Sequence, residues 1–144
     1  VPVSCAHAAA SRGGAAAATW ERRAGPGRPP MCAASLRRLG DPDAKRGLTK
    51  GTFGRVRLGG VTSGRARYEP GGKWSEHVGP GVGAERCEVE HVGLVLSGTA
   101  AAAFDDGRVV LLQAGELFHI PAEPHDRGVV RHEPHVSPLF PVAE

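Results

Sequence analysis

Short apolar runs separated by turn residues fill the chain from residue 52 onward. We expect strands over 53–58, 61–69, 89–97, 99–104, 108–113, 118–120, 127–131 and 135–140. Gly and Pro bound most of these runs, and Asp105-Asp106-Gly107 is the strongest hairpin signal in the chain. Because no segment between them offers the crossover helix that parallel strands need, a parallel α/β fold is disfavoured. The pattern predicts an all-β sandwich or barrel.

The segments before residue 51 have a different character. Residues 1–30 consist mainly of Ala, Gly, Arg and Pro without periodicity, which predicts a disordered, low-complexity leader. Residues 31–50 are expected to be a short helical or irregular lead-in, with a helical turn over 33–39 that ends at Gly40. Residues 51–144 then form the β domain, and a chain of 144 residues allows one such domain.

Charge is distributed unevenly along the chain. Residues 1–60 carry 11 Lys and Arg against three Asp and Glu, whereas residues 61–144 carry seven against 12. A basic N-terminal arm can contact nucleic acid or anionic lipid, but a solvated arm is the commoner outcome. Since neither a recognition helix nor an aromatic stacking platform is visible, we expect no nucleic-acid partner.

The cysteines and the hydropathy bear on location. Cys5, Cys32 and Cys87 are odd in number and widely spaced, so neither a disulfide framework nor a Cys-x-x-Cys zinc knuckle can be read from them. A reducing, cytoplasmic setting is therefore expected. No apolar run approaches the roughly 20 residues that span a bilayer, so no membrane partner is predicted.

Histidines placed at turns provide the candidate chemistry, because imidazoles gathered on one rigid scaffold commonly hold a divalent metal. His77 and His91 lie on different segments and can project into one cavity, and His125 follows Pro121 in a turn that can return to it. Positions four apart on a strand are about 13 Å apart, whereas a metal–histidine bond is about 2 Å. Cys87 can therefore join His91 on one ion only if the chain bends between them.

The spacing of these histidines follows a known pattern. Gly71, five residues and His77 match the opening of a motif that runs glycine, five residues, His-x-His, a gap, Glu, six residues and Gly. His91, six residues and Gly98 match its close, with histidine in place of the usual glutamate. The second histidine of the His-x-His pair is replaced by Gly79.

A second motif follows. Gly115, five residues and Pro121 match its first part, His125 falls one residue short of the expected spacing, and Glu123 replaces a glycine. With both motifs, residues 71–126 resemble a small cupin, a double-stranded β-helix of the jelly-roll type. The resemblance extends over roughly residues 50–140 and is strongest to small single-domain bacterial cupins, which makes 51–144 the expected cupin domain.

The resemblance implies a metal site. The ligands it favours are His77, His91 and His125, with Cys87 as a fourth. An alternative registration places Glu85 and Cys87 at the His-x-His positions. Imidazoles with or without a thiolate suit zinc, iron(II), nickel or copper.

Two further residues are candidates for acid–base chemistry. Glu85 and His119 are expected near the site as an acid or base, although His119 is expected mainly as part of the core or the cavity wall. The C-terminal histidines His132 and His135 are predicted to be exposed.

The leading functional hypothesis is a metal-binding cupin that accepts a small polar molecule in its barrel. If it is an enzyme, the resemblance implies an oxygenase-type or isomerase-type reaction. The alternative is a non-catalytic ligand-binding or sensor module with a structural metal or none, and four protein ligands would favour it. Tyr68 and Trp74 are predicted to line the core or the cavity, and pairing through an outer strand makes a homodimer plausible.

Overall fold

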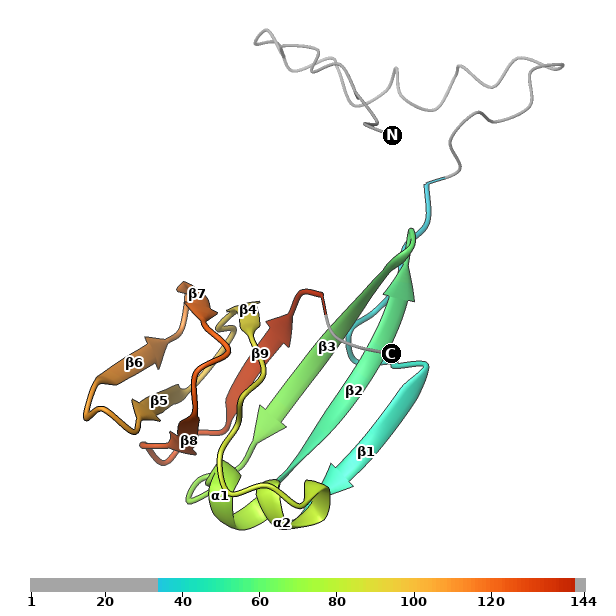
Figure 1. Cartoon of the computed structure of the whole chain (residues 1–144). Helices are drawn as coiled ribbons and strands as arrows, with labels where there is room; N and C mark the ends of the chain where they lie inside the picture. The colour runs from blue at the N-terminus through green and yellow to red at the C-terminus, as the bar shows by residue number, and fades with distance from the viewer. Residues whose placement is uncertain (1–33, 142–144) are drawn as a thin grey trace, which may run out of the picture. The chain divides into compact units, whose positions relative to one another are not determined.

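The structure, a computed structural model, describes residues 34–141 (Figure 1). The chain divides into two units, Val1–Ala34 and Ser35–Glu144, and every helix and strand described here belongs to the second. In order these are β1 (Ala44–Leu48), β2 (Gly51–Leu58), β3 (Val61–Tyr68), α1 (Trp74–His77), α2 (Gly79–Val82), β4 (His91–Leu94), β5 (Thr99–Phe104), β6 (Val109–Gln113), β7 (Leu117–Ile120), β8 (His125–Val129) and β9 (His135–Leu139). The predicted leader over residues 1–30 lies outside the described residues.

The strands form two antiparallel sheets. The larger has the order β1-β2-β3-β9-β4-β7, and the smaller has the order β6-β5-β8. Figure 1 shows the two short helices together at one end of the sheets. One buried cluster takes Ala102, Phe104 and Leu112 from the smaller sheet and Phe118, Ile120 and Leu139 from the larger. The two sheets therefore enclose a common interior, as in a jelly roll.

The hairpin between β5 and β6 shows how local sequence sets the register. Gly107 has a φ of 91°, a conformation that glycine adopts without strain. The Phe104 backbone N–H donates to the Arg108 carbonyl at 2.9 Å. Strand alternation then buries Ala102 and Phe104 while Ala103 faces solvent. The predicted hairpin is confirmed.

Gly93 explains how β4 fits between β7 and β9. A Cβ atom at this position would lie 2.6 Å from the Phe118 ring and 2.7 Å from the Pro138 carbonyl oxygen. No side chain is tolerated at such distances, so only glycine lets the strands approach this closely.

The all-β prediction is confirmed, with local differences. Residues 34–38 form no helix, so the expected turn over 33–39 is wrong for the described part of that segment. β1 lies inside the expected lead-in because it pairs with β2 along its whole length. β4 covers only His91–Leu94 of the predicted strand 89–97. Among residues 34–141, no helix has the length and apolar character needed to cross a bilayer.

Candidate metal centre and barrel interior

Cys87 and His125 are held together by the backbone. They form an isolated antiparallel bridge in which the Cys87 N–H donates to the His125 carbonyl at 2.9 Å and the His125 N–H donates back at 3.0 Å. Residues paired in this way project their side chains to the same face. Cys87 is 4% exposed and His125 is fully buried, so this face is the interior.

His91 joins the pair from the start of β4. Residues 88–90 belong to no strand, and the chain bends there, so the Cys87 Sγ and His91 Nε2 atoms lie 3.2 Å apart. The His91 and His125 rings meet edge to face, with centroids 5.8 Å apart. The bend that the four-residue spacing required is therefore present. One ligand atom from each of the three residues lies within 4.8 Å of the others.

His125 presents an unsatisfied acceptor to this cluster. Its Nδ1 lies 2.7 Å from the Glu123 carbonyl oxygen, which can only accept, so Nδ1 carries the proton. Nε2 then bears a lone pair, is buried, and has no hydrogen-bond partner among the described residues. A backbone carbonyl that orients a histidine in this way is typical support for a metal ligand. The residues present therefore fit a metal ion.

Burial shapes the protonation of the other two members. It lowers the pKa of His91 to about 4, with smaller contributions from Arg127 and His125, so the imidazole is neutral and its nitrogen is free to bind. Burial also raises the pKa of the Cys87 thiol, which is a thiol until a cation displaces its proton. Two imidazoles and one thiolate suit zinc, iron(II), nickel or copper.

His77 lies outside this cluster. It ends α1, and its Nδ1 is 3.0 Å from both the backbone nitrogen and the carbonyl oxygen of Lys73. The structure thus brings together Cys87, His91 and His125 from the four predicted ligands. His77 instead lines a small pocket together with Tyr68 and Trp74, the two aromatic residues that were predicted to line the core or the cavity.

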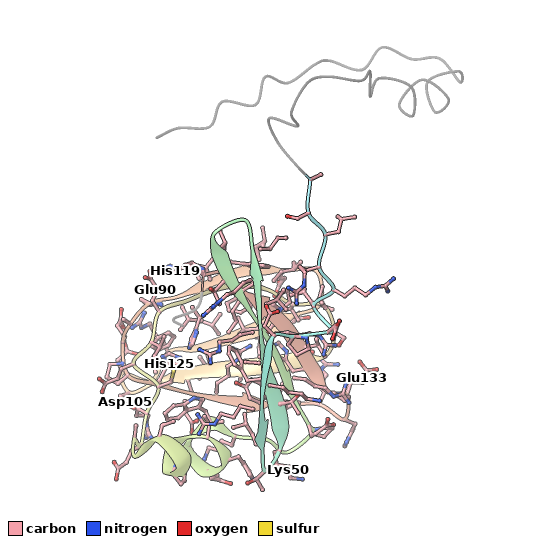
Figure 2. All side chains as sticks on the ribbon, turned by 90° about the vertical axis from the view of Figure 1, so that its right-hand side faces the viewer. Lys50, Glu90, Asp105, His119, His125 and Glu133 are labelled. Carbon is pink, nitrogen blue, oxygen red and sulfur yellow. The ribbon has the colours of Figure 1, made fainter. Side chains whose placement is uncertain are left out.

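The two acid–base candidates lie on the surface. Glu85 is exposed in the segment between α2 and β4. His119 is also exposed, and its Nε2 is 2.8 Å from a Glu90 carboxylate oxygen (Figure 2). Figure 2 shows this pair at one end of the fold, away from His125. The placement of His119 in the core or cavity wall is wrong, because alternation along β7 turns Phe118 and Ile120 inward and His119 outward.

The sequence analysis did not identify a second buried polar cluster, which consists of Arg127, His135 and Ser137. His135 was predicted to be exposed, but it is fully buried, so that prediction is wrong. Its Nε2 lies 2.7 Å from the Nη2 atom of Arg127, which also donates to the Ser137 hydroxyl at 3.0 Å. Burial, and then the charge of Arg127, lowers the pKa of His135 to about 3, so the ring is neutral.

The two buried groups share the interior through β8. His125 and Arg127 are both buried and are two residues apart, which places them on one face of the strand, about 7 Å apart. This alternation was the signal that could have identified Arg127, since any strand that turns His125 inward also turns Arg127 inward. The predicted strand began at residue 127, after His125, so the sequence analysis did not place the two residues on one face of the same strand.

The comparisons with known proteins identify the fold. A protein of unknown function from Rhizobium leguminosarum bv. viciae is 20% identical, with a TM-score of 0.57 over 78% of this chain and 100% of that chain. The polyketide cyclase RemF from Streptomyces resistomycificus is 21% identical, with a TM-score of 0.55 over 76% and 80% of the two chains. A DUF1255 protein of unknown function from Acidithiobacillus ferrooxidans is 23% identical, with a TM-score of 0.51 over 70% and 88%.

No protein-family model matches the sequence, and no curated protein matches it. At these identities the solved structures show a shared fold and nothing more. The shared fold, the two antiparallel sheets and the motif spacing all indicate the same architecture. Residues 35–141 therefore form a small double-stranded β-helix, a fold of the jelly-roll type.

Proposed function

We propose that this protein is a metal-binding cupin in which Cys87, His91 and His125 hold one divalent transition metal inside the barrel. The observation that carries the proposal is the buried Nε2 of His125, which has no hydrogen-bond partner in residues 34–141 and lies beside a thiol and a neutral imidazole. An acceptor buried without a donor costs about 1–3 kcal/mol, and a bound cation would offset that cost. Zinc, iron(II), nickel and copper all suit these ligands.

The number of ligands favours a functional metal over a structural one. Structural zinc sites are closed by four protein ligands, whereas catalytic sites keep a position open. Three clustered ligands would leave a coordination position open for a small polar molecule, and the half-buried His91 is the most exposed of the three. When bound, the metal would supply a Lewis acid or a redox centre. RemF adds only that a protein of this fold can be an enzyme.

An oxygenase-type or isomerase-type reaction therefore belongs to this proposal, with ligand binding without catalysis as its alternative. A cytoplasmic location belongs to it as well, because a reducing setting keeps the Cys87 thiol available to the metal. A membrane or nucleic-acid partner has no part in it, and pairing of two copies through an outer strand would leave the site unchanged.

Metal loading tests the proposal. We expect wild-type protein to bind one equivalent of cobalt(II) with a sulfur-to-metal charge-transfer band in the near ultraviolet. Cys87→Ser should abolish that band. His91→Ala should weaken binding by more than about 100-fold, because changing even a residue that only orients a metal ligand costs about 10- to 100-fold in affinity. His119→Ala, which removes an exposed imidazole, is the matched control and should bind normally.

Circular dichroism of the same variants separates the two roles. Loss of metal with the fold intact would support a functional site, and loss of metal with global unfolding would support a structural one. Unchanged metal binding by His91→Ala would contradict the proposed site altogether.

A further inference from the structure

Arg127 is a buried cation without a counter-charge. The residue is 7% exposed, and none of the ion pairs among residues 34–141 includes it. Burial lowers the pKa of Arg127, but a guanidinium remains protonated at neutral pH. The Phe118 and Tyr68 rings lie 5.3 and 5.8 Å from its central carbon, and such contacts offset only part of the cost of desolvation.

The unsatisfied atoms around Arg127 are donors. Because Arg127 can only donate, His135 must accept at Nε2, and its proton therefore lies on Nδ1. His135 Nδ1 and Arg127 Nε are both buried, and neither finds a partner within the described range. A positive charge with two unused N–H groups calls for an acceptor that is negatively charged, since water would leave the charge uncompensated.

The adjoining pocket is also basic. Its lining includes Arg127, Lys50 and Lys73, with Tyr68 and Trp74 as aromatic walls, and contains no Asp or Glu. Lys73 is engaged by Glu76 and Asp126, whereas neither Arg127 nor the exposed Lys50 takes part in an ion pair among residues 34–141, so Arg127 is the buried uncompensated charge of this wall. The free volume is about 10 Å³, room for about one water molecule, so a larger ligand can enter only if side chains of the lining move.

We propose that Arg127, supported by His135, binds the carboxylate group of a small anionic ligand inside the barrel. A guanidinium matches a carboxylate with paired N–H donors, and the limited room restricts the ligand to a small one. Since Arg127 and His125 share the inner face of β8, the carboxylate would lie beside the metal cluster. The inference rests on the proposed function in that it names the ligand class of the same interior.

A purely structural role makes a different prediction. As a cross-link, Arg127 ties β8 to β9 through His135 and Ser137 and packs on Phe118, and it needs no anion. An anion site instead binds small carboxylates saturably, in a manner that depends on Arg127. Measuring carboxylate binding separates the two roles, whereas stability alone would not.

Calorimetric titration with formate and acetate, at constant ionic strength and with inorganic phosphate as a third probe, is the test. We expect saturable acetate binding to wild-type protein in both metal-free and zinc-loaded forms. Arg127→Gln should weaken it at least about tenfold, because charge-assisted hydrogen bonds are lost. Arg108→Gln is the matched control, since Arg108 is an exposed arginine that pairs with Asp106 and Glu123, and it should bind within about twofold of wild type.

The two proposals can fail separately. If the protein binds acetate but takes up no metal when metal is offered, the carboxylate site is supported and the metal centre is overturned. Binding only in the zinc-loaded form would place the anion on the metal and overturn the role of Arg127. Absence of carboxylate binding in both forms, or tighter Arg127-dependent binding of phosphate, would also overturn it.

A measurement on the wild-type protein covers the case in which Arg127→Gln does not fold. The Arg127 Nε–H resonance, identified by its proximity to the Phe118 and Tyr68 rings, should move downfield saturably as acetate is added. A resonance that does not move would overturn the proposal.

Discussion

The interior contains two buried polar clusters with opposite needs. Around His125 the unsatisfied atom is an acceptor, next to a thiol and a neutral imidazole. Around Arg127 the unsatisfied atoms are donors, and the group carries a full positive charge. A backbone carbonyl sets the tautomer of His125, and a guanidinium sets that of His135. The free ring nitrogen therefore bears a lone pair in His125 and a proton in His135.

The comparison teaches that the polarity of an unsatisfied buried atom indicates the ligand that would complete it. A buried lone pair is completed by a cation, and a buried N–H donor beside a positive charge is completed by an anion. Because His125 and Arg127 are neighbours on β8, one ligand could contact both clusters. Its carboxylate would bind Arg127, and a second electron-rich atom would bind the metal. Each cluster is packed against its own phenylalanine, Phe104 beside His125 at 5.7 Å and Phe118 beside Arg127 at 5.3 Å.

The largest effect should come from those two rings. Both are buried, so Phe104→Ala and Phe118→Ala should each lower the free energy of unfolding by about 3–5 kcal/mol. The milder Phe→Leu changes should separate the clusters: Phe104→Leu should weaken metal binding more, and Phe118→Leu should weaken acetate binding more. Urea unfolding and the two binding assays check this, and equal effects on both ligands would show that the clusters act as one.

A smaller effect should appear with pH. The pKa of His135 is about 3 in the folded protein, below its ordinary value of 6.5. Between these two pH values the unfolded chain therefore binds a proton at His135 and the folded protein does not. Its contribution to stability is complete above about pH 6.5 and decreases as the pH falls toward 3. His135→Gln should therefore have a shallower dependence of unfolding free energy on pH across this window, measured by urea titration of metal-free protein. Identical slopes would mean that His135 is not held neutral.

The smallest effect should come from the surface pair His119–Glu90. Both side chains are more than half exposed, at 56% and 64%, and exposed ion pairs contribute less than about 1 kcal/mol. Glu90→Gln should leave stability, metal content and acetate binding close to the wild-type values. A loss of metal or acetate binding in this variant would show that the site extends to the outer face of β7.

Local pattern anticipated much of this architecture. The strands β2, β3 and β5 and the hairpin at Asp105-Asp106-Gly107 follow from alternation and turn chemistry, which act over a few residues. For Cys87 and His91 the pattern gave only a condition, a bend between them if they share an ion, and the structure shows that the condition is met. Predictions that depended on the ends of strands were less accurate, since pairing with distant strands sets where a strand begins and ends.

The amino-acid pattern alone established an all-β cupin-like domain with histidines available for a metal, because periodicity and motif spacing are local properties. Which side chains meet was decided by long-range pairing: the bridge between residues 87 and 125 gathers Cys87, His91 and His125 and leaves His77 at the end of α1, outside the cluster. The burial of His135 was likewise not visible in the sequence, and that of Arg127 could be read only once β8 was known to begin at His125. Their environment is built by β3, β7 and β9, strands that are far apart in the chain and become neighbours only when the sheets close around the interior.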